Sequence, residues 1–210
     1  MRFTSSLFFA IVVASTCFLS QAHAKFDAGQ INVSFGNKDV VPEGKAAVGA
    51  DADKWNCPDG ANGENVELTN AKGEKSDVKV TFAAAGTYDA ADAGFVGTAW
   101  EKLLRKYLYA NDAKTVTLTG LTPGTKYDLY VYSASNADNR QTKFTVGTDM
   151  KITVFKMDNK ELMDTVSYAK FSPTADADGK ISFTYEGTGA NDGETAEGNL
   201  NGLQIAPAAK

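Results

Sequence analysis

Four residues in segments predicted to be loops have side chains suited to binding a sugar. An exposed aromatic ring can stack on the apolar face of a pyranose, while Asp, Asn, Arg or Gln side chains hydrogen-bond to its hydroxyls. Trp55 and Tyr88 supply the rings, and Asn139 and Arg140 supply polar groups from a third loop. We therefore predict that these residues bind carbohydrate. The competing interpretation is that Trp55 packs into the core and that Arg140 pairs with a surface acid.

Clustered oxygen-bearing side chains give a second kind of candidate site, for a metal ion. Calcium prefers carboxylate, amide and carbonyl oxygens as ligands. Asp192, Glu194, Glu197 and Asn199 lie close together near the end of the chain, and residues 176–179 form a shorter cluster. The first cluster predicts a structural calcium site. Because Asp and Asn are also the residues that turns require, a turn is the alternative for both clusters and is favoured at residues 176–179.

The chain lacks the side chains that many catalytic sites need. Its single histidine, His23, and one of its two cysteines, Cys17, lie in a predicted leader peptide. A histidine base, a histidine-activated nucleophile and a histidine-rich zinc site are therefore excluded from the remaining chain. Cys57 has no internal disulfide partner, so it is either a buried small side chain or a thiol that pairs between two chains. No carboxylate pair stands out among 26 acidic residues, and we predict that the protein is not an enzyme.

The first 24 residues have the pattern of a signal peptide. Arg2 gives the positive start, an apolar run extends from Leu7 to Leu19, and Ala22–Ala24 forms a small-x-small cleavage site. We expect residues 1–24 to be removed by cleavage near Ala24. The product would be secreted to the extracellular space, the cell surface or the periplasm, with residues 25–210 as a single β-sandwich domain.

The charge pattern argues against two classes of partner. The formal net charge is -5 and the basic residues form no cluster, which disfavours nucleic acid and anionic membrane surfaces. No later apolar run approaches the roughly 20 residues that a membrane-spanning helix needs. We therefore expect neither nucleic-acid binding nor membrane insertion.

Alternating apolar and polar residues predict the elements that position these candidates. About ten short runs, separated by Gly, Pro, Asn and Asp, have the period of two that is typical of strands. Two of them flank Pro123–Gly124 within residues 115–133 and predict a β-hairpin with Tyr127 in the core. Many short strands with frequent turns predict an all-β fold, an antiparallel β-sandwich or jelly roll.

One segment has a helical period instead. Trp100, Leu103, Leu104, Tyr107 and Leu108 recur at the spacing of one helix face, which predicts a short amphipathic helix over residues 98–110. We expect this helix to pack on the sandwich, where it would cover the tyrosines at positions 130 and 132. The alternative is that these two tyrosines face solvent.

The order of several motifs resembles a known module. INVSFG, GFVGTAWEKLLRKYLY, LTGLTPGTKYDLYVYS, KFTVG, YAKF, GKISFTY and NGLQI together resemble a galactose-binding-domain-like β-sandwich of large secreted bacterial proteins, of the carbohydrate-binding-module or malectin-like kind. This resemblance implies a jelly roll of two antiparallel sheets that binds polysaccharide or another glycan, with a structural calcium ion. Leu121, Pro123 and Tyr127 also resemble the turn and tyrosine corner of a fibronectin type III domain, a minor alternative.

Two functions from different classes follow from these observations. The leading hypothesis is a secreted, non-catalytic, lectin-like protein that binds carbohydrate. The alternative is a structural or adhesive protein of the cell surface or extracellular matrix, whose copies associate with one another. A fibronectin-like interaction module is the minor third hypothesis.

Overall fold

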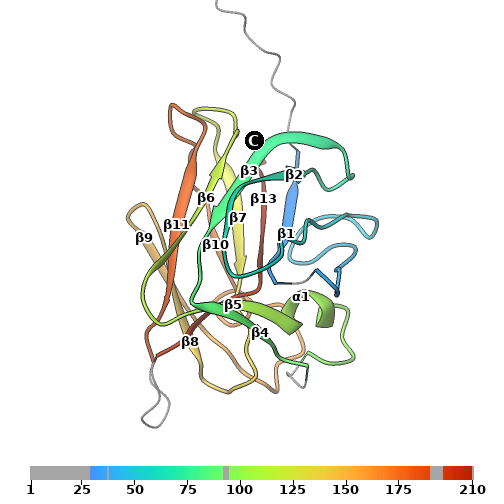
Figure 1. Cartoon of the computed structure of the whole chain (residues 1–210), viewed down its shortest axis with the longest axis vertical. Helices are drawn as coiled ribbons and strands as arrows, with labels where there is room; N and C mark the ends of the chain where they lie inside the picture. The colour runs from blue at the N-terminus through green and yellow to red at the C-terminus, as the bar shows by residue number, and fades with distance from the viewer. Residues whose placement is uncertain (1–28, 37, 92–94, 190–195, 210) are drawn as a thin grey trace, which may run out of the picture.

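Two antiparallel sheets face each other and form the body of the protein (Figure 1). The computed structural model describes residues 29–209 except residue 37, residues 92–94 and residues 190–195. The predicted signal peptide therefore lies outside the described residues, as do Asp192 and Glu194 of the predicted calcium site. Every pairing between the strands that the structure describes is antiparallel. The predicted all-β antiparallel sandwich is confirmed.

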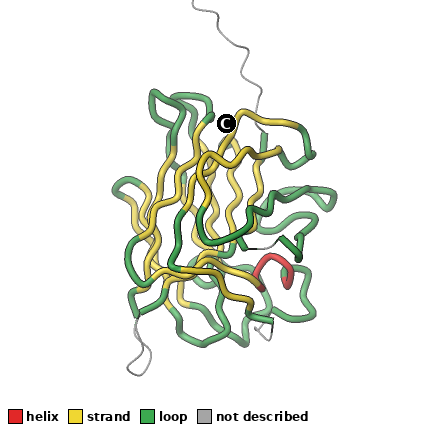
Figure 2. The backbone as a smooth tube through the Cα atoms, in the orientation of Figure 1, coloured by secondary structure: helices red, strands yellow, loops and turns green. Residues whose placement is uncertain are grey.

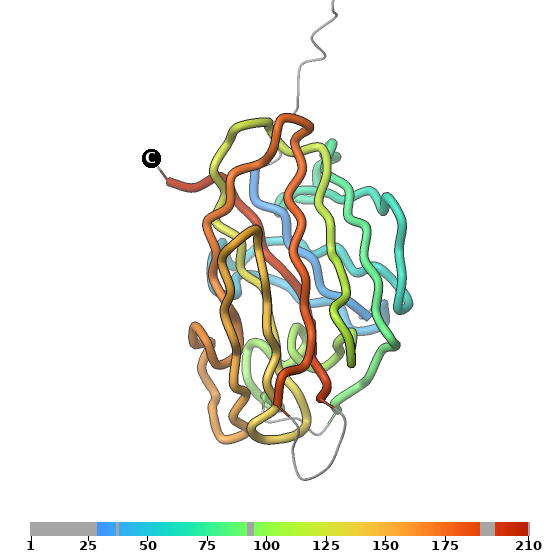
Figure 3. Tube along the Cα trace, turned by 90° about the vertical axis from the view of Figure 1, so that its left-hand side faces the viewer, coloured from blue at the N-terminus to red at the C-terminus, as the bar shows by residue number. Residues whose placement is uncertain are grey.

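The larger sheet has six strands, which run side by side in Figure 3. In spatial order they are β2 (Gly63–Thr69), β3 (Lys75–Phe82), β6 (Lys114–Thr119), β11 (Ile181–Gly187), β8 (Gln141–Val146) and β9 (Asp149–Val154). Their side chains alternate between the core and the outer face, as the period of two in the sequence requires.

Two smaller sheets complete the fold. The four-stranded sheet consists of β1 (Ile31–Ser34), β13 (Gly202–Pro207), β7 (Tyr127–Tyr132) and β10 (Tyr168–Phe171). The three-stranded sheet consists of β12 (Gly198–Leu200), β5 (Lys106–Ala110) and β4 (Gly86–Asp89), and it crosses one end of the sandwich (Figure 1).

The main core fills the space between the four- and six-stranded sheets. Apolar residues of β1, β7 and β13 meet those of β3, β6, β8 and β11 in one cluster of buried side chains. The hydrophobic effect contributes about 25 cal/mol for each Å² of apolar surface removed from water, so this layer is the main source of stability.

The predicted hairpin over residues 115–133 is wrong. Its two strands, β6 and β7, belong to different sheets, so the connection between them is a corner of the sandwich. The Tyr127 hydroxyl accepts a hydrogen bond from the backbone N–H of Thr122, at 3.0 Å, and holds this corner. The period of two predicted the strands correctly, but it carries no information about which neighbour each strand pairs with.

The predicted helix over residues 98–110 is much shorter in the structure. Helix α1 covers only Glu101–Arg105, the one α-helix among the described residues (Figure 2), and the chain continues as strand β5. Leu103 and Leu104 are buried as expected, whereas Tyr107 and Leu108 lie on a strand that pairs with β4 and β12. Pairing on both sides satisfies the β5 backbone, and such tertiary pairing overrides a weak helical preference. Strand β4 lies in a segment that the sequence predicted to be a loop.

A second apolar cluster covers the outer face of the four-stranded sheet. Tyr130 and Tyr132 of β7 pack there against Trp55, Leu103 and Leu104, so both tyrosines are buried. The covering material is helix α1 together with the loops on the same side of the sheet (Figure 1).

Cys57 lies at the edge of this second cluster and is half-buried. Burial raises the pKa of its thiol to about 11. The thiol is therefore protonated at neutral pH and a poor nucleophile, as expected for a cysteine with a packing role.

Candidate functional site

Loop residues that the sequence predicted to bind two different ligands meet at one end of the sandwich. Strands β4, β5 and β12 cross this end, at the bottom of Figure 1, and β8 begins here. We call the group formed by Tyr88, Tyr107, Asn136, Arg140 and Glu197 the tyrosine site. Its members come from three strands or their flanks and from the loop between β7 and β8, so only the fold brings them together.

Tyr88 presents an aromatic ring at the edge of the three-stranded sheet. The residue is 46% exposed, and its ring stacks on Tyr107 with the centroids 5.5 Å apart and the planes inclined by 30°. The two residues are directly opposite partners on β4 and β5. The ring is thus supported by the protein and accessible to solvent at once, which is the geometry for stacking on a planar apolar surface.

Asn136 ties the two tyrosine hydroxyls together. The Tyr107 hydroxyl donates to Oδ1 of Asn136 at 3.2 Å, and Nδ2 of Asn136 donates to the Tyr88 hydroxyl at 3.2 Å. Each bond constrains a side chain, so the Tyr88 ring is held in place before any ligand arrives. Such preorganisation lowers the entropic cost of binding.

Arg140 and Glu197 form a partly buried ion pair beside the tyrosines. The side chains are 16% and 25% exposed, and Nη1 of Arg140 donates to Oε1 of Glu197. Nδ2 of Asn199 donates to the same oxygen at 3.1 Å. Burial first, and then the charge of Glu197, raises the pKa of Tyr107 to about 12. The Tyr107 phenol therefore remains a hydrogen-bond donor at neutral pH.

Glu197 and Asn199 are the two predicted calcium ligands that lie within the described residues. Arg140 already places a positive charge at Glu197, and Asn199 contacts Glu197 through its amide nitrogen. Residues 29–209, apart from the gaps given above, contain no group of three or more His, Cys, Asp or Glu side chains that could hold a metal ion. Calcium binding by all four residues stays a prediction.

The other two predicted sugar-binding residues lie in different surroundings. Asn139 is exposed next to Arg140, has a backbone φ of 60°, and accepts a hydrogen bond from Nζ of Lys156. Trp55 is only 8% exposed, and its Nε1 donates to the carbonyl oxygen of Gly44 at 2.9 Å. The structure thus places Trp55 in the second apolar cluster, as the competing interpretation expected, and away from the tyrosine site.

Sequence reasoning did not assign Tyr107 and Asn136 to a site. The helical period predicts Tyr107 on a helix face, and no sequence pattern singles out Asn136 at the start of the loop that contains Arg140. Their role depends on the pairing of β4 with β5, which no local pattern reveals.

No protein-family model matches this sequence, and no curated protein matches it. Solved structures do match. The ANX2 ectodomain from Arabidopsis thaliana superposes with a TM-score of 0.52 at 10% identity, over 86% of this chain and 50% of that chain. A second structure, of the plant receptor-like kinase ANX2, gives a TM-score of 0.50 at 10% identity, over 86% and 48%.

A partial match covers 50% of this chain and 79% of the CBM36-1 domain of a multidomain xylanase from the hindgut metagenome of Trinervitermes trinervoides, at 19% identity and a TM-score of 0.31. This chain spans about half the length of the receptor structures it matches. At 10% identity those two matches describe the fold. This fold is similar to that of the two ANX2 structures, and it agrees with the β-sandwich expected from the motifs.

Proposed function

We propose that this protein is a secreted, non-catalytic carbohydrate-binding module and that the tyrosine site binds the sugar. The observation that carries the proposal is the Tyr88 ring, which is 46% exposed and stacked on Tyr107. A pyranose has one face of C–H groups, and an accessible aromatic ring at a fixed orientation is a matching surface for it.

Polar groups beside the ring suit the hydroxyls of a sugar. In the described part of the chain the guanidinium of Arg140 donates only through Nη1, so its other N–H groups are free to donate to a ligand. Asn136 and Asn139 add amide groups from the same loop. An aromatic surface rimmed by a few oriented donors and acceptors is the usual composition of a saccharide site.

Two observations support an extracellular module that is not an enzyme. The sequence after the predicted signal peptide contains no histidine, and the matched ANX2 structure is an ectodomain.

None of the helices in the described residues is long and apolar enough to span a membrane.

Retention on immobilised polysaccharides and binding to a glycan array test this function. We expect the purified protein to bind at least one glycan, and Tyr88→Ala to weaken that binding about tenfold, since ring stacking contributes about 0.5–1.5 kcal/mol beyond the area it buries. Tyr88→Phe keeps the ring and should bind within about threefold of the wild type.

The matched control is Met150→Ala, which removes another exposed side chain, 56% exposed, from strand β9. This variant should bind as the wild type does. Absence of wild-type retention on every glycan tested, or equal retention by Tyr88→Ala with an unchanged melting temperature, would refute the proposal.

A further inference from the structure

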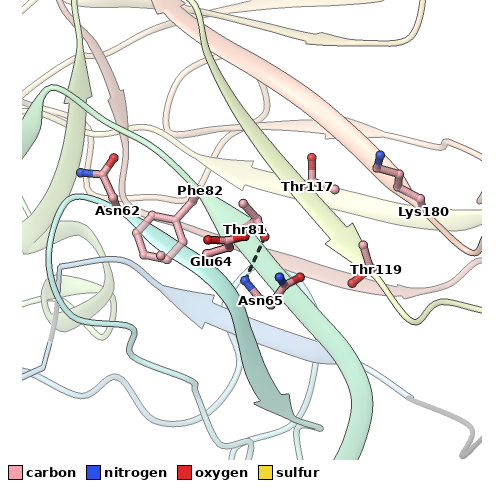
Figure 4. Close-up of a pocket in the computed structure, with 9 residues that line it drawn as sticks. Asn62, Glu64, Asn65, Thr81, Phe82, Thr117, Thr119 and Lys180 are labelled. Carbon is pink, nitrogen blue, oxygen red and sulfur yellow. Dashed lines mark hydrogen bonds between the residues drawn. The ribbon is translucent and has the colours of Figure 1, made fainter.

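A groove on the outer face of the six-stranded sheet is separate from the tyrosine site. It has a volume of about 630 Å³ and opens between the start of β2 and the start of β11 (Figure 4). We call it the threonine groove. Its lining consists of Asn62, Gly63, Glu64, Asn65, Thr81, Phe82, Thr117, Thr119 and Lys180.

The groove lies beside a bulge in strand β2. The register of this strand with β3 shifts between Gly63 and Val66, and Asn65 there has a backbone φ of 51°. The N–H of Asn65 donates to Oγ1 of Thr81 at 3.0 Å, a bond drawn in Figure 4. A Cβ atom on Gly63 would lie 2.4 Å from the ring of Phe82, so a larger residue here would collide with that buried side chain. Bulges of this kind redirect side chains from the regular face of a sheet.

Several polar side chains of the groove have no partner among the described residues. The carboxylate of Glu64, the amide of Asn65, the hydroxyl of Thr119 and the ammonium of Lys180 form no hydrogen bond or ion pair with any described residue. Figure 4 shows Glu64 and Asn65 on one side of the groove, and Thr119 and Lys180 on the other. These groups are therefore available to a ligand lying between them.

The charges of the groove select the class of ligand. Glu64 and Lys180 contribute one negative and one positive charge, and the other polar lining groups are neutral amides and hydroxyls. A polyphosphate or nucleic acid requires a basic groove, which one lysine facing one glutamate does not provide. A neutral polysaccharide has many hydroxyl groups, and each hydroxyl can both donate a hydrogen bond to the groove and accept one from it.

We infer that the threonine groove is a second glycan-binding site, which makes the chain bivalent for polysaccharide. The inference rests on the proposed function, because it assumes the same class of ligand. The inference adds a site on a different face of the fold. This site has no exposed aromatic ring, because its one aromatic residue, Phe82, is only 2% exposed. Two sites on one chain raise the overall affinity for a polymer even when each site is weak.

Amide chemical shifts in solution test the inference, with cellohexaose, xylohexaose and maltohexaose as separate probes. The Tyr88→Ala variant is used so that binding at the tyrosine site is weakened. We expect at least one hexasaccharide to shift the amide signals of Thr81, Thr117 and Thr119. Replacing Glu64 and Lys180 by Ala, and Asn65 by Gly, should weaken this binding about tenfold, because three hydrogen-bonding groups are lost.

Glycine at position 65 tolerates the positive φ, so that substitution adds no backbone strain. Glu67→Ala is the matched control. Glu67 is an exposed acid on strand β2, as Glu64 is, but it forms an ion pair with Lys79 and does not line the groove. This control should bind as its parent does.

The outcomes separate the two proposals. If a hexasaccharide changes the amide chemical shifts of the wild type only around Tyr88, glycan binding at the threonine groove is rejected and the proposed function stands. Shifts at the three threonines alone would retain the groove and reject the tyrosine site. If saturating hexasaccharide changes neither the amide signals around Tyr88 nor those of the three threonines in the wild type, both proposed sites are rejected.

Discussion

At the scale of single residues, exposure separates aromatic side chains that the sequence treats alike. Trp55 and Tyr88 both lie in segments predicted to be loops, yet Trp55 is buried in the second apolar cluster and Tyr88 is exposed. The difference arises from their partners: the Trp55 indole donates to a buried carbonyl, whereas the Tyr88 hydroxyl accepts from the exposed Asn136. Only Tyr88 can therefore offer its ring to a ligand.

Two glycines at the corner between β6 and β7 allow a prediction about backbone strain. Gly120 and Gly124 have φ values of 79° and 69°, but a Cβ on Gly120 would lie 2.0 Å from the carbonyl oxygen of Asp77, and one on Gly124 would meet nothing within 4 Å. We expect Gly124→Ala to lower the free energy of unfolding by about 1 kcal/mol and Gly120→Ala by about 3 kcal/mol or more. Urea unfolding measures both. Equal losses would contradict the close packing of this corner.

At the scale of elements, strand β4 carries the exposed ring, and an ion pair fastens its end. Asp89, the last residue of β4, accepts two hydrogen bonds from the Arg105 guanidinium, at 2.6 and 3.0 Å. Arg105 is the last residue of helix α1, so this contact joins the helix to the strand beside Tyr88. The hydrogen bond from Arg105 holds the pKa of Asp89 below its usual value.

This lowered pKa predicts how one contribution to stability changes with pH. A carboxyl group whose pKa is lower in the folded state stabilises the fold above its unfolded pKa, about 3.9, and the contribution disappears as pH falls through the folded value. Both side chains are about a third or more exposed, so screening limits the contribution to about 0.5 kcal/mol.

Asp89→Asn should therefore be less stable than the wild type by about this amount at pH 7. The gap should close once the pH is well below 3.9, where Asp89 is also uncharged. Unfolding free energies of both proteins across this range provide the measurement. A gap that is constant with pH would assign the effect to packing and not to charge.

At the scale of the whole molecule, a buried polar network fastens a long loop across the four-stranded sheet. Gln204 is fully buried, accepts a hydrogen bond from the Tyr132 hydroxyl, and donates to Oδ1 of Asn32 at 2.9 Å and to the carbonyl oxygen of Val48 at 3.1 Å. The N–H of Ala47 donates to the Tyr132 hydroxyl at 2.9 Å. Residues of β1, β7, β13 and the loop thus satisfy one another's polar groups.

Removing the centre of this network should cost more than removing a similar side chain elsewhere. Gln204→Ala removes the acceptor of the Tyr132 hydroxyl and of the Val48 N–H, whereas Oδ1 of Asn32 and the carbonyl oxygen of Val48 keep donors in Gln30 and Ala46. Each buried unpaired donor costs about 1–3 kcal/mol, so we expect a loss of about 3 kcal/mol. Gln141→Ala, a half-buried glutamine whose side chain forms no hydrogen bond with the described residues, should lose less than about 1 kcal/mol. Chemical denaturation of the two variants compares them, and similar losses would argue against the network.

The sequence by itself determined the all-β class and most of the strands, though not β4 and β5, and it supplied part of the candidate site. Val78, Val80 and Phe82 alternate because one face of their strand is buried, and this local period is visible in any window of a few residues. The types of Tyr88, Asn139 and Arg140 likewise predict them as candidate sugar-binding residues. These features depend on neighbours along the chain.

Only the tertiary structure decided which strands pair and which side chains meet. It separated β6 from β7 into two sheets, turned Tyr107 from a helix onto a strand opposite Tyr88, and joined Arg140 to Glu197, 57 positions away in the sequence. It also buried Trp55 and opened the groove at the β2 bulge. Strand pairing depends on hydrogen bonds and packing between residues far apart in the chain, so no local period encodes it.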